Sequence, residues 1–220
     1  MNKSIAKLHF ITSPSDQHST MDQIKQVVLG GCNWVQLRMK EADSKEFEQT
    51  ALQALSFCMD NDAKLIINDN VQLAAKIGAD GVHLGKNDMS PSEARRILGD
   101  HMIIGGTANT FEDIKQLVAQ GVDYIGLGPF RFTETKKKLS PVLGLEGYQN
   151  IISQCRENKI NIPVIAIGGL VPEDLKGLFD AGVHGIAISS YLTKKEQPGA
   201  QTIELLTSTG KYSSANWIKK

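Results

Sequence analysis

The chain has 220 residues, of which 41% are hydrophobic and 22% charged, so it is long enough to bury a large core as one domain. Lysine plus arginine equals aspartate plus glutamate at 24 each, so no net charge favours binding to nucleic acid or to an anionic membrane. The three cysteines are scattered and suggest neither a disulfide framework nor a zinc site. Because no signal-peptide core or run of about 20 apolar residues is present, we expect a cytoplasmic protein that does not span a membrane.

Short β-branched runs alternate with amphipathic helical stretches along the chain. Eight runs are predicted to be strands: 8–12, 34–39, 64–69, 81–85, 102–108, 124–129, 163–169 and 185–190. This alternation implies parallel strands with right-handed crossovers, and eight such units predict an α/β fold, a single-domain TIM barrel over residues 1–206. An open doubly wound sheet is the alternative. Residues 207–220 are expected to form a flexible tail.

A weak internal repeat supports the strand count. A glycine, then two residues later Asn, Asp or His, precedes every second predicted strand. These glycines are Gly31, Gly78, Gly121 and Gly182. A left-handed backbone after a helix favours glycine, and the polar residue can bond the turn before the strand begins.

The second predicted strand alternates polar and apolar side chains. Strand periodicity places Gln36, Arg38 and Lys40 on one face, about 6.5–7 Å apart. Two cations at this spacing can bind neighbouring phosphoryl groups while the amide holds a neutral group further in. The pattern predicts a pocket for a diphosphate ester, and an edge strand with one solvated face is the alternative.

Polar residues also cluster where strands end, which is where barrels carry their chemistry. Asp69 ends the third strand and Asp88 follows the fourth, so the two carboxylates can share a Mg²⁺ ion with substrate phosphate. The alternative has Asp69 capping a helix and Asp88 in a turn. His83 is either a general base or an interior histidine bonded to a neighbour, and we assign it no catalysis.

The later loops predict a second anion site. Thr133, Thr135 and Lys136 follow the sixth strand in a loop that suits a lid over bound phosphate. The pair Gly168-Gly169 follows the seventh strand and Ser189 follows the eighth, where barrels commonly bind a phosphate monoester. Two phosphate sites are therefore predicted, one with Mg²⁺ and one without.

In order and spacing these motifs resemble the thiamine phosphate synthases from Leu8 to about Leu206. The matching segments are 36–40, 67–69, 82–85 with Asp88, 126–129 with 133–136, 167–169 and 188–189. The resemblance implies a transferase that joins hydroxymethylpyrimidine diphosphate to a thiazole phosphate and releases diphosphate. Its substrates would be small molecules, and its oligomeric state, including a homo-oligomer, is left open.

The resemblance also implies roles for individual residues. The pyrimidine diphosphate would be held by Gln36, Arg38, Lys40, Asn68, Thr107 and Lys136. Asp69 and Asp88 would hold Mg²⁺, and the thiazole phosphate would be held by Thr133, Thr135, Gly168, Gly169, Ile188 and Ser189. Catalysis would rest on Arg38, Lys40, Lys136 and Gln36.

Four positions depart from the family's usual residues: Lys86, Thr107, Phe132 and Lys138, where Gln, Ser, Pro and an acidic or small residue are frequent. These changes are expected to alter affinity without changing the reaction. Two other functions stay open. One is an isomerase resembling the thiazole tautomerases, which would not need the Mg²⁺-diphosphate residues, and the other is a non-catalytic module that binds phosphate ligands.

Overall fold

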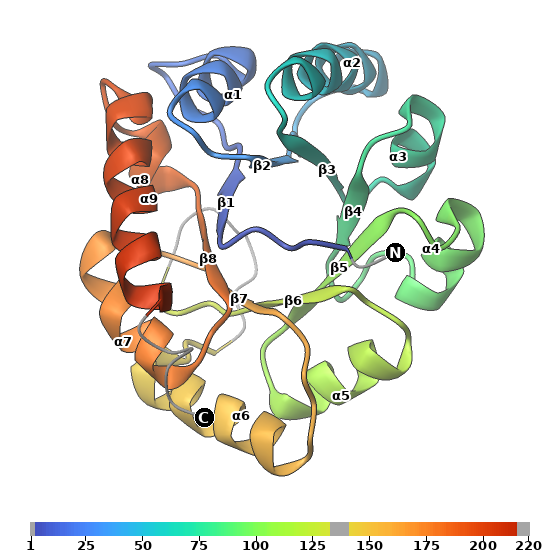
Figure 1. Ribbon diagram of the computed structural model, residues 1–220. Coiled ribbons are helices and arrows are strands. Elements are labelled where there is room, and N and C mark those ends of the chain that lie inside the picture. The colour runs from blue at the N-terminus through green and yellow to red at the C-terminus, as the bar shows by residue number, and fades with distance from the viewer. Residues whose placement is uncertain (1–2, 133–140, 215–220) are drawn as a thin grey trace.

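A computed structural model describes residues 3–132 and 141–214 and contains a closed parallel barrel (Figure 1). The strands are β1 Leu8–Ile11, β2 Trp34–Leu37, β3 Lys64–Asn68, β4 Gly81–Leu84, β5 Ile103–Ala108, β6 Tyr124–Leu127, β7 Val164–Ala166 and β8 Gly185–Ile188. They pair in chain order, and β8 pairs with β1. The predicted TIM barrel is confirmed, and the open doubly wound sheet is wrong because the sheet has no free edge.

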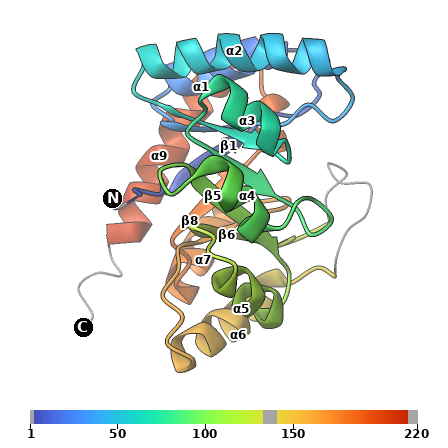
Figure 2. The same ribbon diagram turned by 90° about the vertical axis from the view of Figure 1, so that its right-hand side faces the viewer.

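Helices form a ring outside the strands (Figures 1 and 2). They are α1 Thr20–Leu29, α2 Ser44–Asp60, α3 Val71–Ile77, α4 Pro91–Leu98, α5 Phe111–Ala119, α6 Gly144–Glu157, η1 Pro172–Asp174, α7 Leu175–Ala181, α8 Ser190–Thr193 and α9 Pro198–Ser214. Helix α5 begins with a capping box, in which the Thr110 side chain accepts from the Asp113 N–H and the Asp113 side chain accepts from the Thr110 N–H. None of the helices in the described ranges is long and apolar enough to cross a membrane.

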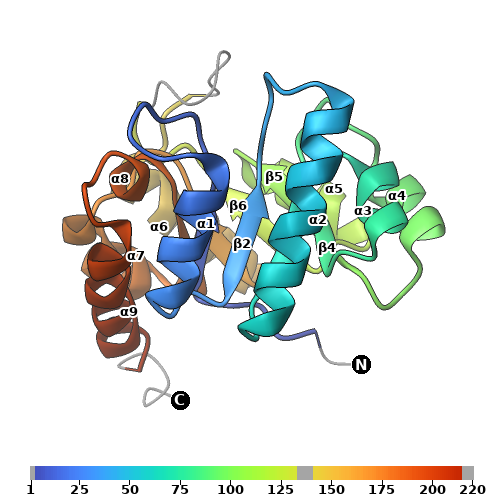
Figure 3. The same ribbon diagram turned by 90° about the horizontal axis from the view of Figure 1, so that it is seen from above.

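The last helix differs from the expected flexible tail. Helix α9 continues through Ser214, with Leu205 and Thr209 buried at 1% and 3% exposure. It packs against α1 and α7 and so closes the outer ring, because α8 has only four residues (Figure 3). The boundary placed at residue 206 therefore falls inside a packed helix, and residues 215–220 lie outside the described ranges.

Strand β2 is shorter than predicted, which corrects the argument from alternation. It ends at Leu37, so Lys40 lies in the loop beyond the strand and is not placed by strand periodicity. Beyond Leu37 the Thr12 hydroxyl, and not a strand backbone, forms hydrogen bonds with the next residue of the β2 segment, Arg38. Thr12 Oγ1 accepts from the Arg38 N–H at 2.8 Å and donates to the Arg38 carbonyl at 3.1 Å, because β1 has also ended.

The barrel interior contains large rings made possible by glycines. A β-carbon at Gly105 would lie 2.2 Å from Cζ of Tyr124, and one at Gly126 would lie 2.9 Å from Cε1 of His83. Below them His9 stacks on Trp34 with ring centroids 4.3 Å apart. Burial holds the pKa of His9 well below its usual value, so this ring is neutral at pH 7.

The repeated glycines adopt the predicted conformation. Their φ angles are positive at all four positions: Gly31, Gly78, Gly121 and Gly182. We expected the polar residues that follow to bond the turn, but two of the four, Asp80 and Asp123, bond the backbone of the neighbouring odd-numbered strand instead. Asp80 accepts from the Leu65 N–H and Asp123 from the Ile104 N–H, each at 2.8 Å. At these two positions the repeat thus joins strands at the amino end of the barrel.

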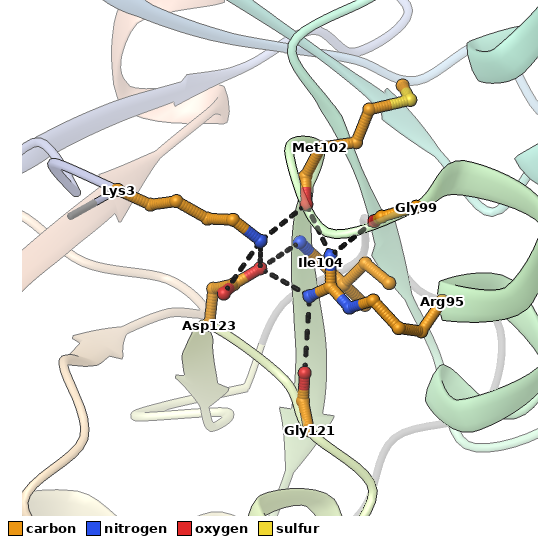
Figure 4. A network of polar contacts seen from close by, with 7 residues as sticks. All are labelled: Lys3, Arg95, Gly99, Met102, Ile104, Gly121 and Asp123. Carbon is orange, nitrogen blue, oxygen red and sulfur yellow. Dashed lines mark hydrogen bonds and ion pairs between the residues drawn. The ribbon is translucent and has the colours of Figure 1, made fainter. Parts of the chain in front are cut away.

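That end is closed by residues 3–7, which run across the face of the barrel nearest the viewer in Figure 1. Lys3 and Arg95 both pair with the Asp123 carboxylate, at 2.9 and 2.7 Å, and both also donate to the Met102 carbonyl (Figure 4). These ionic side chains are only 14–20% exposed. Asp123 therefore links Lys3, α4 and β5 in one polar network.

Candidate active site

A carboxylate lies at the carboxyl end of β3 in an unusual backbone conformation. Asp69 has a φ of +64°, in the left-handed region that non-glycine residues seldom occupy. The carboxylate forms an ion pair with Lys40 from the β2 loop. Helix α3 is capped by Asn70, so the alternative role of Asp69 as a helix cap is wrong. A strained residue that serves no cap is typical of a functional site.

The second carboxylate lies beside the first. Burial raises the pKa of Asp69, and hydrogen bonding to the Asp88 carboxyl raises it further. Asp88 also accepts from the Gly85 N–H at 2.7 Å, so its expected turn role is real and coexists with the contact to Asp69. Two adjacent carboxyl groups, whose negative charges would repel each other, are a suitable place for a cation.

These residues fit Mg²⁺. The part of the chain that the structure describes has no group of three or more His, Cys, Asp or Glu side chains that would enclose a metal. Mg²⁺ commonly uses one or two carboxylates and fills its remaining positions with water and substrate phosphate. Asp69 and Asp88 provide that number of ligands.

Arg38 and Lys40 place positive charge on the same side of the barrel. Arg38 is half-buried, and burial lowers its pKa although Asp69 and Glu41 oppose that shift. Lys40 is 49% exposed and lines a pocket of about 440 Å³ together with Asn68 and Asp69. The structure therefore brings together the predicted Arg38, Lys40, Asn68, Asp69 and Asp88.

Gln36 lies deeper, inside the barrel, and is 3% exposed. It hydrogen-bonds to the hydroxyl of Tyr124. That hydroxyl is 3.0 Å from His83 Nδ1, and His83 Nε2 is 3.0 Å from Thr107 Oγ1. His83 is thus the hydrogen-bonded interior histidine of the two possibilities. These four side chains therefore form a continuous series of hydrogen bonds inside the barrel, deeper than Arg38 and Lys40.

The other side of the barrel mouth carries the second group of predicted residues. Gly168 and Gly169 have φ angles of +95° and +70°. Ile188 is the last residue of β8, and Ser189 follows it with a fully buried Oγ that has no hydrogen-bond partner among the residues described. Buried hydroxyls are normally paired, so this one is suited to a ligand oxygen. Thr133, Thr135, Lys136 and the Lys138 departure lie outside the described ranges.

Three residues of the site were missed from sequence. Tyr124 orients Gln36 and His83, Thr12 holds the backbone of Arg38, and Arg131 contacts the loop that contains Gly169. Tyr124 occupies an inward position of β6, and its hydroxyl was an available signal. The other two act through contacts between distant segments and leave no local pattern.

Comparisons with known proteins identify the family to which the chain is similar. A sequence model of the thiamine monophosphate synthase family matches residues 8–192. A thiamine-phosphate synthase from Bacteroides thetaiotaomicron is 50% identical over 202 residues, covering 92% of this chain and 97% of the relative. A thiamine-phosphate synthase from Bacteroides fragilis is 52% identical over 199 residues, covering 90% of this chain and 98% of the relative.

A solved structure, thiamine phosphate pyrophosphorylase from Pyrococcus furiosus, superimposes with a TM-score of 0.83 at 29% identity. The match covers 94% of this chain and 96% of that one. These likenesses extend over the barrel as a whole. They support the synthase interpretation, and neither the tautomerase-like isomerase nor the non-catalytic binding module gains support from them.

Proposed function

The chain belongs to the thiamine monophosphate synthase family, and we propose that it joins hydroxymethylpyrimidine diphosphate to a thiazole phosphate and releases diphosphate. One observation carries the proposal. Asp69 and its partners lie around β2 to β4, whereas the unpaired Ser189 and the Gly168-Gly169 loop follow β8 and β7, on the opposite side of the closed barrel. Two anion-binding regions facing one mouth suit a reaction between two phosphorylated substrates.

In this proposal Asp69 and Asp88 hold Mg²⁺, which when bound would neutralise charge on the diphosphate. Arg38 and Lys40 contact the diphosphate and stabilise the negative charge that grows on it as it leaves. Arg38 retains its charge even when half-buried, because the guanidinium does not deprotonate at physiological pH. Asn68 and Thr107 bind the same substrate, and Lys136 adds a cation from the loop after β6.

The bonding changes need no protein nucleophile. The bond between the pyrimidine methylene carbon and the diphosphate oxygen breaks, and the oxygen keeps the electron pair. The aminopyrimidine donates electron density to that carbon, and the thiazole nitrogen then forms the new bond. The Gln36 amide orients the pyrimidine, while Thr133, Thr135, Gly168, Gly169, Ile188 and Ser189 hold the thiazole phosphate so that its nitrogen is aimed at the carbon.

The proposal is tested by incubating the purified chain with both substrates and Mg²⁺ and measuring diphosphate and thiamine phosphate together. Equimolar formation of the two products is expected, and each substrate alone should give neither. Lys40→Met is the matched variant, because it keeps side-chain length and removes the cation; the control is Lys176→Met, a lysine on α7 that pairs with Asp180. Diphosphate release without thiamine phosphate in the wild type would contradict the proposed transfer.

The surroundings of the enzyme belong to the same proposal. All three cysteines are free and buried, which suits a reducing compartment such as the cytoplasm. The balanced charge supports small-molecule substrates and not nucleic acid. Size-exclusion chromatography with light scattering measures whether the chain forms a homo-oligomer.

A further inference from the structure

We propose that Arg131 is a positioning residue that holds the Gly168-Gly169 loop in a conformation competent to bind the thiazole phosphate. The inference rests on the proposed function and assigns a role to a side chain outside the substrate-contacting set. Arg131 lies just beyond β6, and its contacts reach residues 168–174 beyond β7. Those contacts are with backbone carbonyls and with a single carboxylate.

Three successive carbonyl groups of the β7 loop are occupied by the Phe130-Arg131 segment. The Ile167 carbonyl accepts from the Phe130 N–H at 2.9 Å, and the Gly168 carbonyl accepts from the Arg131 N–H at 3.1 Å. The Gly169 carbonyl accepts from Arg131 Nη1 at 2.7 Å. The pairing of β6 with β7 is thus continued beyond the strands, with a guanidinium in place of the next backbone donor.

This arrangement leaves the amide groups of the same loop available. Within the described ranges, the N–H groups of Gly168, Gly169 and Leu170 have no hydrogen-bond acceptor. Successive backbone N–H groups without partners form a concave site for an anion. The nearby unpaired Ser189 hydroxyl follows the adjacent strand β8 and adds a donor. Because the Phe130-Arg131 segment binds the carbonyl groups of the loop, the loop's N–H groups are left to bind a phosphate.

The guanidinium is itself fixed from three sides. Nη1 and Nη2 each lie 2.7 Å from a different oxygen of Asp174, whose side chain is 9% exposed. The same carboxylate accepts from the Val171 N–H at 2.9 Å. The guanidinium also lies over the Phe130 ring, 5.0 Å from its centroid. One planar fork thus joins the beginning and the end of the 169–174 loop.

Close packing explains why the loop needs this support. A β-carbon at Gly169 would lie 2.5 Å from Cγ of Arg131, so the side chain lies directly against the glycine backbone. Two consecutive glycines with positive φ have unusually large conformational freedom, and ordering them costs more entropy than ordering other residues. If Arg131 is removed, the loop should populate conformations that bind phosphate poorly.

The kinetic test uses Arg131→Met, which keeps length and packing against Phe130 but removes all five donors. We expect the KM for the thiazole phosphate to rise about tenfold, the ratio that 1.4 kcal/mol of lost preorganisation produces. The KM for the pyrimidine diphosphate and kcat at saturation should change less than about twofold, since saturating phosphate restores the loop. Arg131→Lys should resemble Arg131→Met, because an ammonium cannot reproduce the fork.

A direct binding measurement separates this inference from the proposed reaction. Protein labelled with ¹⁵N-glycine is titrated with inorganic phosphate, and the amide signals of Gly168 and Gly169 are followed. Both should shift in the wild type, with an apparent Kd about tenfold weaker in Arg131→Met. Arg95→Met is the matched control, since it breaks an arginine–aspartate pair at the other end of the barrel and should leave the titration unchanged.

If Arg131→Met fails to fold, Asp174→Asn is the second variant. Its amide keeps an oxygen acceptor for the Val171 N–H. Like Arg131→Met, it should bind phosphate more weakly than the wild type. Equal Kd values in all these proteins, or equal rises in both KM values, would overturn the role of Arg131. If the wild type makes no thiamine phosphate yet the phosphate titrations differ as expected, the proposed function fails and the positioning role stands.

Discussion

The two ends of the barrel use the same residue types in opposite ways. At the amino end Asp123 is bonded to Lys3, Arg95 and a backbone N–H, so all three ionic side chains of this cluster have partners in the fold. At the carboxyl end Asp69 sits in a left-handed conformation with a raised pKa, pressed against a second carboxyl group. The first cluster is satisfied within the fold, and the second is the site that we propose for Mg²⁺.

This contrast follows from how a parallel barrel is built. Helices end and strands begin at the amino end, so short glycine turns bring polar residues onto neighbouring backbones. Strands end at the opposite rim and release longer loops, whose side chains are not needed to close the sheet. Substitutions at the two ends should therefore separate activity from stability.

The largest effect is expected for Asp69→Asn. It removes one of two proposed Mg²⁺ ligands, and turnover should fall about 10²-fold or more, with a higher Mg²⁺ requirement. Stability should not fall, because asparagine tolerates positive φ.

The effect of Asp69→Asn on stability is tested by measuring how the free energy of unfolding depends on pH in the absence of Mg²⁺. A carboxyl group whose pKa is raised by folding contributes stability below its unfolded pKa and loses that contribution as pH rises through the folded value. Asp69→Asn should therefore become more stable relative to the wild type as pH rises through that window. Unchanged Mg²⁺ dependence of turnover would remove Asp69 from the metal site.

Asp123→Ala is expected to have the opposite profile. It leaves two partly buried cations and the Ile104 N–H unpaired, and should lower the free energy of unfolding by about 2–3 kcal/mol. For a chain of this length the Tm should fall by roughly 4–12 °C, while KM values at 25 °C stay constant. Thermal unfolding and steady-state kinetics test the pair of claims. A large kinetic effect with an unchanged Tm would contradict the claim that the amino end contributes to stability and the carboxyl end to activity.

Gln36→Met examines the deep floor of the site. The hydroxyl of Tyr124 keeps its contact with His83, so the fold should tolerate the change. Binding of the pyrimidine diphosphate should weaken by about 1–3 kcal/mol, the usual cost of an unpaired buried group, with diphosphate alone hardly affected. Calorimetry with both ligands distinguishes these effects. Equal weakening of binding for the pyrimidine diphosphate and for diphosphate alone would mean that Gln36 contacts the phosphates and not the pyrimidine ring.

The smallest effect is expected for Lys86→Gln, which restores the residue frequent in the family. Lys86 is 41% exposed and pairs with Asp113 at 2.6 Å, and an exposed ion pair contributes at most about 1 kcal/mol. The free energy of unfolding should change by less than about 0.5 kcal/mol and kcat/KM by less than about twofold. Chemical denaturation and kinetics provide the measurement. A tenfold kinetic change would show that the rim between β4 and β5 takes part in binding.

Much of this protein was determined by local sequence. Hydrophobic periodicity and the repeated glycines predict eight strands in their observed order, because each pattern reports whether its own segment can be buried or turned. Strand ends that carry Asp69, Gly168 and Ser189 likewise predict which residues reach the rim, since the carboxyl ends of parallel strands meet at one edge of the sheet.

Only the tertiary structure decided how those residues are held. Strand β2 ends at Leu37, and the side chain of Thr12, just beyond β1, bonds the backbone N–H and carbonyl of Arg38 that follow. Helix α9 extends through Ser214 because α1 and α7 offer it a surface, although its serine-rich sequence suggests fraying. The links from Tyr124 to Gln36 and from Arg131 to Asp174 join residues far apart in the chain. Such contacts depend on where two segments meet in space, and no local pattern records that.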